Sequence, residues 1–311
     1  MRVAVVGPGA VGRLFATFLS EAADVVLVDY KKERAKALSQ NGYRLTGLAS
    51  RYVKVPVVVE PEGAFDAVLV CVKAYSTVAV ARKLKQWSGS AAVLTFQNGM
   101  GNAETLQEAV GATRLVVGTN SYGANIAPDD PYLVHYAGEG EVVLGILDEA
   151  AEDALTLFLR LFEQAGICVR RASDINAVLW EKLLVNAAIN PLCALLGIRN
   201  GELPRLPSLW RLATGIVREG EAVAAAAAVA VPHNIVERVR KVCEKTANNR
   251  CSTLQDISAK RPTEIPYING YIAKKARELG VPAPLNGAIA AIFDAYNALQ
   301  SPGGTHTDGN S

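Results

Sequence analysis

The segment from Trp180 to Leu195 carries three polar side chains at steps of four residues, Lys182, Asn186 and Asn190. Residues four apart lie on one face of an α-helix, with a drift of about 40° per step. A lysine can donate a proton in acid catalysis, and asparagines can hold a carboxylate or a hydroxyl without adding charge. The spacing therefore predicts a helix that presents a proton donor and two amides in one slanting column.

Apolar residues surround this column on nearly every other side. They are Trp180, Leu183, Leu184, Val185, Ala187, Ala188 and Ile189. A buried polar group without a partner costs about 1–3 kcal/mol, and more if it is charged. A polar ligand would offset that cost, whereas a column that faces solvent would need no partner. Pro191 lacks a backbone donor, so we expect the helix to kink or end there, with carbonyl groups exposed near the column.

A glycine-rich turn at the N-terminus indicates a second site. In VAVVGPGAVGRLFATFL, a strand-like run is followed by three glycines and then a helical pattern. Gly7 would make the tight turn, Gly9 would let a pyrophosphate approach the backbone, and Gly12 would let the helix pack close to the sheet. A glycine-rich turn without a ligand is the alternative. We predict a dinucleotide site on Gly7, Pro8, Gly9, Ala10, Val11 and Gly12.

The residues after the second expected strand leave the choice of dinucleotide open. Asp29 stands where an acid would bind the ribose hydroxyls of NAD. Lys31 and Lys32 follow it closely and could neutralise the 2′-phosphate of NADP, or could simply be a solvated helix start.

Two types of pattern divide the chain. Short β-branched runs at residues 2–6, 25–29, 67–72, 91–96 and 115–117 predict buried parallel strands, with helical segments between the first pairs. A β-rich stretch at 133–145 and a helix at about 148–165 follow. Long helical patterns then cover about 172–196, 208–229, 234–247 and from Pro266 to near Gln300. We predict an α/β fold, with an N-terminal dinucleotide-binding domain (1–170), a helical domain (171–300) and a disordered tail (301–311).

Composition argues for a small-molecule partner. The chain has 311 residues, with 32 basic and 30 acidic side chains, so neither nucleic acid nor a membrane surface is an expected partner. The longest uninterrupted apolar stretch, Ala222 to Val231, is too short to span a bilayer. Five scattered cysteines without a CxxC pair suit a reducing cytoplasm, and three scattered histidines lack the spacing of metal ligands, so we expect no metal site. We expect a cytoplasmic protein.

Seven separated motifs resemble the ketopantoate reductases. They are GPGAVG, VCVKA at Lys73, QNGMG at Asn98, LWEKLLVNAAINPL, NGEL at Asn200, TANNRCSTLQDI, and TEIPYING with Glu264. The similarity runs in order from Met1 to about Leu279. It implies a Rossmann domain, a helical C-terminal domain and a substrate cleft between them. It also implies NADPH-dependent reduction of 2-dehydropantoate to pantoate, a step toward pantothenate and coenzyme A.

The resemblance also implies roles for individual residues. Lys182 matches the family's catalytic lysine and Glu264 its active-site glutamate. Asn98 matches an asparagine near the nicotinamide, and Lys73 a lysine on the cofactor side of the cleft. Substrate contacts are implied for Asn98, Lys182, Asn186, Asn190, Asn200, Asn249 and Ser252, and cofactor contacts for the glycine turn with Asp29, Lys31, Lys73 and Asn98.

The chemistry suits these residue types. Hydride delivery to a 2-oxo acid builds negative charge on the carbonyl oxygen, which needs a proton donor and fixed hydrogen-bond donors. Burial would lower the pKa of Lys182 from about 10.4, and Glu264 nearby would raise it again. Glu264 could instead be an acid that stabilises a helix dipole before Pro266. The alternatives are a reductase of another branched or aromatic 2-oxo acid, and a non-catalytic NADP(H) sensor. A homodimer is compatible with the apolar second half.

Overall fold

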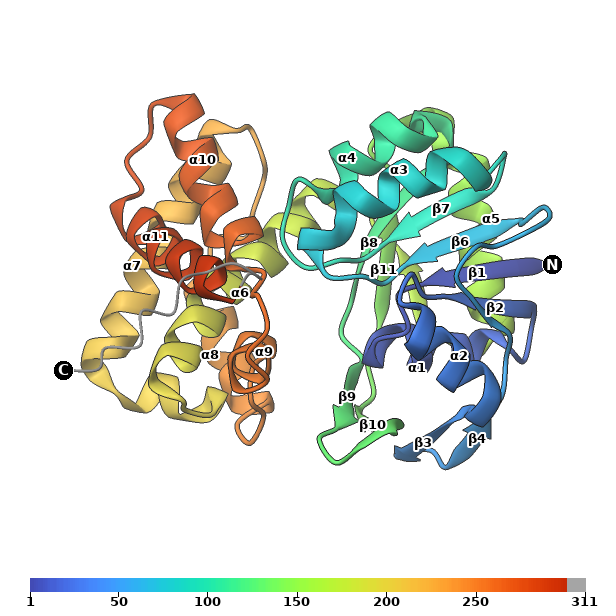
Figure 1. Ribbon diagram of the computed structural model, residues 1–311. Helices are drawn as coiled ribbons and strands as arrows, with labels where there is room; N and C mark the ends of the chain where they lie inside the picture. The colour runs from blue at the N-terminus through green and yellow to red at the C-terminus, as the bar shows by residue number, and fades with distance from the viewer. Residues whose placement is uncertain (301–311) are drawn as a thin grey trace. The chain divides into compact units, whose positions relative to one another are not determined.

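The computed structural model describes residues 1–300, which form two compact units. The first contains residues 1–97 and 102–175, and the second contains 98–101 and the residues from Asn176 onward (Figure 1). The second unit therefore starts five residues after the boundary expected from the sequence, and it includes a short segment from the middle of the first half. The expected disordered tail, 301–311, lies outside the described residues.

An eight-stranded sheet forms the first unit. Its strand order is β12-β11-β8-β7-β6-β1-β2-β5. From β8 to β5 every neighbouring pair is parallel, and β11 is antiparallel to β8. The strands are β1 (Arg2–Val6), β2 (Asp24–Val28), β5 (Val57–Val58), β6 (Ala67–Val70), β7 (Ala92–Thr95), β8 (Leu115–Asn120), β11 (Val142–Gly145) and β12 (Val169–Arg171).

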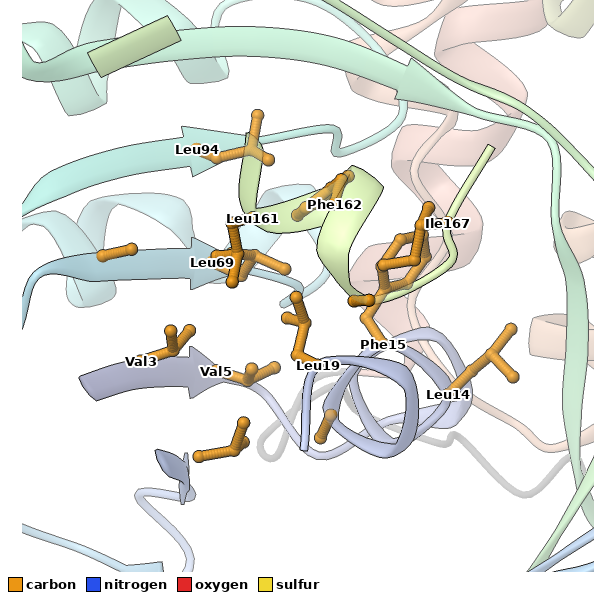
Figure 2. Close-up of a cluster of buried hydrophobic side chains, with 14 of the residues drawn as sticks. Val3, Val5, Leu14, Phe15, Leu19, Leu69, Leu94, Leu161, Phe162 and Ile167 are labelled. Atoms are coloured by element: carbon orange, nitrogen blue, oxygen red, sulfur yellow. The ribbon is translucent and has the colours of Figure 1, made fainter. Parts of the chain in front are cut away.

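Both faces of this sheet are buried, which explains its continuous β-branched runs. On one face Val3, Val5 and Leu69 pack against α1 (Ala10–Leu19) and α5 (Glu152–Gln164), as Figure 2 shows. The alternate residues Ala4 and Val68 are also fully buried. The remaining α-helices of the unit are α2 (Lys32–Asn41), α3 (Thr77–Trp87) and α4 (Asn102–Val110), and its short 3-10 helices are η1 (Ala74–Ser76), η2 (Ala112–Arg114) and η3 (Glu149–Ala151).

The strand order reverses beside β1. From β1 the chain first builds outward through β2 to β5, and then returns to the other side of β1 to add β6, β7 and β8. In open α/β sheets, a ligand binds where the order reverses, outside the carboxyl ends of the strands. This Rossmann-type topology places Gly7 at that position, directly after β1.

A second sheet was not expected from the sequence. It has the order β4-β3-β10-β9, with β3 (Tyr43–Gly47), β4 (Arg51–Val53), β9 (Gly123–Ala127) and β10 (Asp130–Gly138). It packs on α1, where the ring of Phe18 lies 5.6 Å from that of Tyr136 and 5.8 Å from that of Tyr122. The sheet therefore holds the helix that follows the glycine-rich turn.

Helices form the second unit in the part of the chain that the structure describes. Their bounds are α6 (Ile175–Leu196), η4 (Asn200–Arg205), α7 (Pro207–Ala226), α8 (Ile235–Lys245), α9 (Ser252–Ser258), η5 (Ile265–Tyr267), α10 (Asn269–Leu279) and α11 (Pro284–Leu299). The helical pattern expected from Pro266 to near Gln300 contains the two α-helices α10 and α11, and Gly280 in the left-handed conformation ends α10. Buried residues of α6 belong to the hydrophobic core of this unit.

Among the described helices, α6 alone is long and apolar enough to cross a membrane by length and composition. Of its most apolar window, 61% is buried inside the structure. The core helix of a soluble protein passes the same test, so this single helix is a weak indication.

Candidate active site

The three glycines of the first turn have three different environments. Gly7 has φ +99°, and a Cβ there would meet the backbone nitrogen of Val72 at 2.9 Å. A Cβ on Gly12 would lie 2.1 Å from the carbonyl oxygen of Gly7. At Gly9 a Cβ would meet nothing within 4 Å, and φ is −72°. Gly7 and Gly12 are therefore required by the fold, whereas the space in front of Gly9 fits a pyrophosphate on the free N–H groups of α1.

Asp29 at the end of β2 is bound by its own chain. The side chain is 3% exposed, and its Oδ1 accepts hydrogen bonds from Arg34 Nη2 at 2.9 Å and from the backbone nitrogen of Lys31 at 3.0 Å. Arg34 Nε pairs with Oδ2. Both carboxylate oxygens are thus engaged by a guanidinium, and Arg34 is fixed beside the two lysines that open α2.

The polar column lies on α6 as its spacing predicted. Lys182 and Asn186 are partly buried, and Asn190 is 6% exposed. Leu184 and Ala188, on the opposite side of the helix, are fully buried. The column is therefore buried at Asn190 and keeps part of its surface exposed at Lys182 and Asn186.

Pro191 does not end α6, which continues to Leu196. We expected a kink or an end of the helix at this proline; the end was wrong, and the kink stays a prediction. Side chains from elsewhere bind the carbonyl groups around Pro191. Pro191 has no N–H for the carbonyl of Ala187, and Asn269 Nδ2 donates to that oxygen at 3.1 Å. The thiol of Cys251 donates to the carbonyl of Asn190 at 3.4 Å. The helix therefore stays continuous beneath its polar column.

Glu264 and Asn98 lie together in the second unit. Glu264 is buried and precedes η5, and its Oε2 accepts a hydrogen bond from Asn98 Nδ2 at 3.4 Å. Gly99 has φ +79°, and a Cβ there would lie 2.4 Å from the carbonyl oxygen of Tyr267. Met100 donates its backbone N–H to the same oxygen at 2.9 Å. The glycine thus allows the segment 98–101 to pack on η5, beside Glu264.

Lys182 is placed electrostatically near this glutamate. Burial lowers the pKa of Lys182 to about 8, and the charge of Glu264 acts in the opposite direction. A lysine with a pKa near neutrality can be protonated at pH 7 and still release its proton. The group formed by Lys182, Glu264 and Asn98 is therefore able to act as a general acid with a carboxylate and an amide beside it.

Asn200 makes hydrogen bonds to the segment between α8 and α9. Its Nδ2 donates to Thr246 Oγ1 at 2.9 Å, and its backbone nitrogen donates to the carbonyl of Asn249 at 3.1 Å. Asn249 is exposed, and Ser252 is the first residue of α9. Asn200 therefore holds the segment that leads to α9. Substrate contacts of Asn200, Asn249 and Ser252 stay predictions.

Lys73 lies in the first unit, as the residue before the short helix η1 (Ala74–Ser76) that follows β6. Its role at the cofactor also stays a prediction. Nearby, Gln97 Nε2 donates to the carbonyl of Val72 and to Thr77 Oγ1, both at 2.9 Å. Gln97 thus joins the ends of β6 and β7, a role that the sequence reasoning missed.

Comparisons with known proteins identify the family of this chain. The family model described as "Ketopantoate reductase PanE/ApbA" matches residues 3–149, and "Ketopantoate reductase PanE/ApbA C terminal" matches residues 174–297. The chain belongs to the ketopantoate reductase family. A relative in Archaeoglobus fulgidus, named 2-dehydropantoate 2-reductase, is 36% identical over 93% of this chain and 95% of its own length.

Solved structures of similar proteins extend along nearly the whole chain. A PanE/ApbA family ketopantoate reductase from Ralstonia eutropha JMP134 has a TM-score of 0.87 and 28% identity, and covers 96% of this chain and 99% of its own. A D-mandelate dehydrogenase solved with NADH has a TM-score of 0.89 and 24% identity, and covers 97% and 100%. At that identity the second likeness concerns the fold alone. The ketopantoate reductase family and its two-part fold, expected from the motifs, are both confirmed.

The sequence reasoning missed three side chains around the predicted site residues of this ketopantoate reductase family member. They are Arg34, which binds Asp29; Asn269, which donates to the carbonyl of Ala187; and Asn297, which binds the backbone of Thr263. The Asn297 Oδ1 accepts from the nitrogen of Thr263 at 2.7 Å, and its Nδ2 donates to the Thr263 carbonyl at 3.1 Å, next to Glu264. The last two have no local signal, since they are bonded across 82 and 34 residues of sequence, whereas Arg34 lies only five residues after Asp29.

Proposed function

We propose that this protein reduces 2-dehydropantoate to pantoate with NADPH, as a step in the formation of pantothenate and coenzyme A. The observation that carries the proposal is the trio of Lys182, Glu264 and Asn98, on a chain that belongs to the ketopantoate reductase family. The bound dinucleotide supplies the hydride for the substrate carbonyl. The reaction needs one proton as well, and this must come from the protein or from water.

Lys182 is the proposed proton donor. Negative charge builds on the carbonyl oxygen during reduction, and an ammonium both stabilises that charge and delivers the proton. Glu264 keeps more of the lysine protonated than burial alone would allow, because it raises the pKa that burial lowers. Asn98 holds the carboxylate of Glu264 through its amide nitrogen.

Asn186 and Asn190 are proposed to orient the substrate. They continue the column of Lys182 along α6, and their amides can donate to a carboxylate or a hydroxyl without competing for the proton. A 2-oxo acid offers both a carboxylate and a carbonyl at a fixed spacing. A column with one cation and two neutral amides suits such a monoanion.

The preference for NADPH is proposed from the surroundings of Asp29. Its carboxylate is engaged by Arg34 and by the backbone of Lys31, so it is a poor acceptor for a ribose hydroxyl. Lys31, Lys32 and Arg34 instead supply positive charge at the end of β2, which suits a 2′-phosphate. These small soluble reactants also suit a cytoplasmic enzyme, and the expected homodimer stays a prediction.

A substrate panel tests the activity. Oxidation of NADPH is followed by absorbance with 2-dehydropantoate, with smaller and larger branched 2-oxo acids, and with an aromatic 2-oxo acid. We expect the highest kcat/KM for 2-dehydropantoate. A higher kcat/KM for another acid would identify a different reductase, and cofactor binding without turnover of any acid would leave only a sensor.

The cofactor preference is tested by Arg34→Gln. This change should raise the KM for NADPH by about tenfold or more, because a charge-assisted contact to the 2′-phosphate is lost. The KM for NADH should stay the same or fall, because Asp29 loses its guanidinium partner and can accept a ribose hydroxyl. Arg44→Gln is the matched control, since Arg44 is also an arginine of this unit paired with an aspartate, Asp130. Equal effects of Arg34→Gln on both cofactors would contradict the assignment.

A further inference from the structure

Arg13 is a buried cation behind the glycine-rich turn. It is the fourth residue of α1 and is 2% exposed. Its Nε donates to the carbonyl of Pro8 at 2.8 Å, and its Nη1 donates to the carbonyl of Pro131 in β10 at 2.5 Å. The guanidinium therefore connects the turn between β1 and α1 to the second sheet.

The charge of Arg13 is not needed for these two contacts. A neutral amide could donate to two carbonyl groups without the cost of burying a cation. A positive charge in the first turn of a helix is also opposed by the helix dipole. Burial and the neighbouring Arg34 together lower the pKa of Arg13 to about 10, although Tyr43, Asp29 and Asp130 raise it, and the side chain is still a cation at neutral pH.

Among residues 1–300, no carboxylate forms an ion pair with the guanidinium of Arg13. Asp29 and Asp130 both act on Arg13 at longer range, but their carboxylates are paired with Arg34 and Arg44. A buried positive charge next to the turn therefore remains available to an anion. The open space in front of Gly9 is where the pyrophosphate of a dinucleotide would place two negative charges.

We propose that Arg13 is a positioning residue for the dinucleotide. Arg13 fixes the Pro8 carbonyl and so the shape of the turn, and its positive charge attracts the pyrophosphate from behind the turn. It does not touch the cofactor. The proposal rests on dinucleotide binding at this turn, and it is independent of which 2-oxo acid the enzyme reduces.

The test is direct binding of NADPH without substrate, measured by titration calorimetry. Arg13→Gln keeps hydrogen-bond donors but removes the positive charge. Arg13→Lys keeps the charge but cannot bind the carbonyls of Pro8 and Pro131 together. Arg13→Met removes the charge and the donors. We expect Arg13→Met to raise the Kd at least about tenfold, which corresponds to about 1.4 kcal/mol of binding free energy. Arg13→Gln and Arg13→Lys should each lose part of that affinity.

Tyr43→Phe is the matched control. The Tyr43 hydroxyl donates to the carbonyl of Arg13 at 2.9 Å and contacts Thr17, so its loss weakens the same cluster without changing the guanidinium. We expect Tyr43→Phe to lower Tm with an unchanged Kd. Higher salt should narrow the Kd difference between wild type and Arg13→Gln, which a purely structural role would not cause.

The outcomes separate this inference from the proposed function. If wild-type protein binds NADPH and all three Arg13 variants that fold keep its Kd, Arg13 is only a structural bridge and the inference is overturned. If Arg13→Met does not fold, the Kd values of Arg13→Gln and Arg13→Lys decide. Failure of the wild type to bind NADPH, or binding without turnover, would instead refute the proposed function.

Discussion

Replacing Glu264 by glutamine should move the pH dependence of the enzyme in a defined direction. The pKa of Lys182 is about 8, as the result of burial that lowers it and of Glu264 that raises it. A group with this pKa is roughly nine-tenths protonated at pH 7 and roughly one-tenth protonated at pH 9. If Lys182 is the proton donor, reduction should therefore slow as the pH rises through about 8. Glu264→Gln removes the raising influence, so this decline should begin at a lower pH.

The measurement is kcat/KM for 2-dehydropantoate between about pH 6 and pH 10 at constant ionic strength, because kcat/KM reports the pKa values of the free enzyme. Lys182→Ala should lower kcat by about 10²- to 10⁴-fold, the usual contribution of general acid catalysis, and should leave the Kd for NADPH unchanged. Lys182→Arg keeps the charge but cannot release the proton near neutral pH, so it should lose both activity and the decline near pH 8. A decline near pH 8 that survives in Lys182→Arg, or that moves upward in Glu264→Gln, would refute the reasoning.

Three further changes have distinct expected results. Gly9→Val should fold normally, because a Cβ there meets nothing within 4 Å, but should abolish NADPH binding in a calorimetric titration; unchanged affinity would exclude this turn as the cofactor site. Asn186→Ala should raise KM for the 2-oxo acid if its hydrogen bond forms in the ground state, or lower kcat if the bond forms only in the transition state, and steady-state kinetics that show neither would remove it from the substrate site. Asn269→Leu should lower the free energy of unfolding, measured in urea, by about 1–3 kcal/mol, because the carbonyl of Ala187 loses its donor. This loss should be smaller in a Pro191→Ala background, where residue 191 regains a backbone N–H. Equal losses in both backgrounds would contradict the pairing of Asn269 with this carbonyl.

Local patterns were enough to predict the elements that carry the chemistry. Continuous β-branched runs marked the parallel strands because both faces of that sheet are buried. The four-residue spacing of Lys182, Asn186 and Asn190 marked one face of α6 because helix geometry fixes it. The glycine spacing after β1 was equally informative, since each glycine has its own steric environment in the structure. In each case a single element determines the pattern.

Contacts between distant segments could not be predicted in the same way. The strands β3 and β4 are short, with only some of their side chains buried, so they leave no continuous apolar run. The partner of the Ala187 carbonyl lies 82 residues away, and an asparagine has no sequence pattern that announces such a bond. Whether the helix would end at Pro191 could therefore not be decided from the sequence, because the donor that replaces its missing N–H belongs to another helix.

The QNGMG motif shows where this limit affects the active site. From the sequence it is one loop after a strand. In the structure Gln97 is bonded to Val72 and Thr77 in the first unit, whereas Asn98 is bonded to Glu264 in the second. The division requires Gly99, because any side chain there would collide with the backbone of Tyr267. Gly99 is thus required because Asn98 approaches the carboxylate of Glu264, 166 residues away. The motif alone gives no sign of this distant partner.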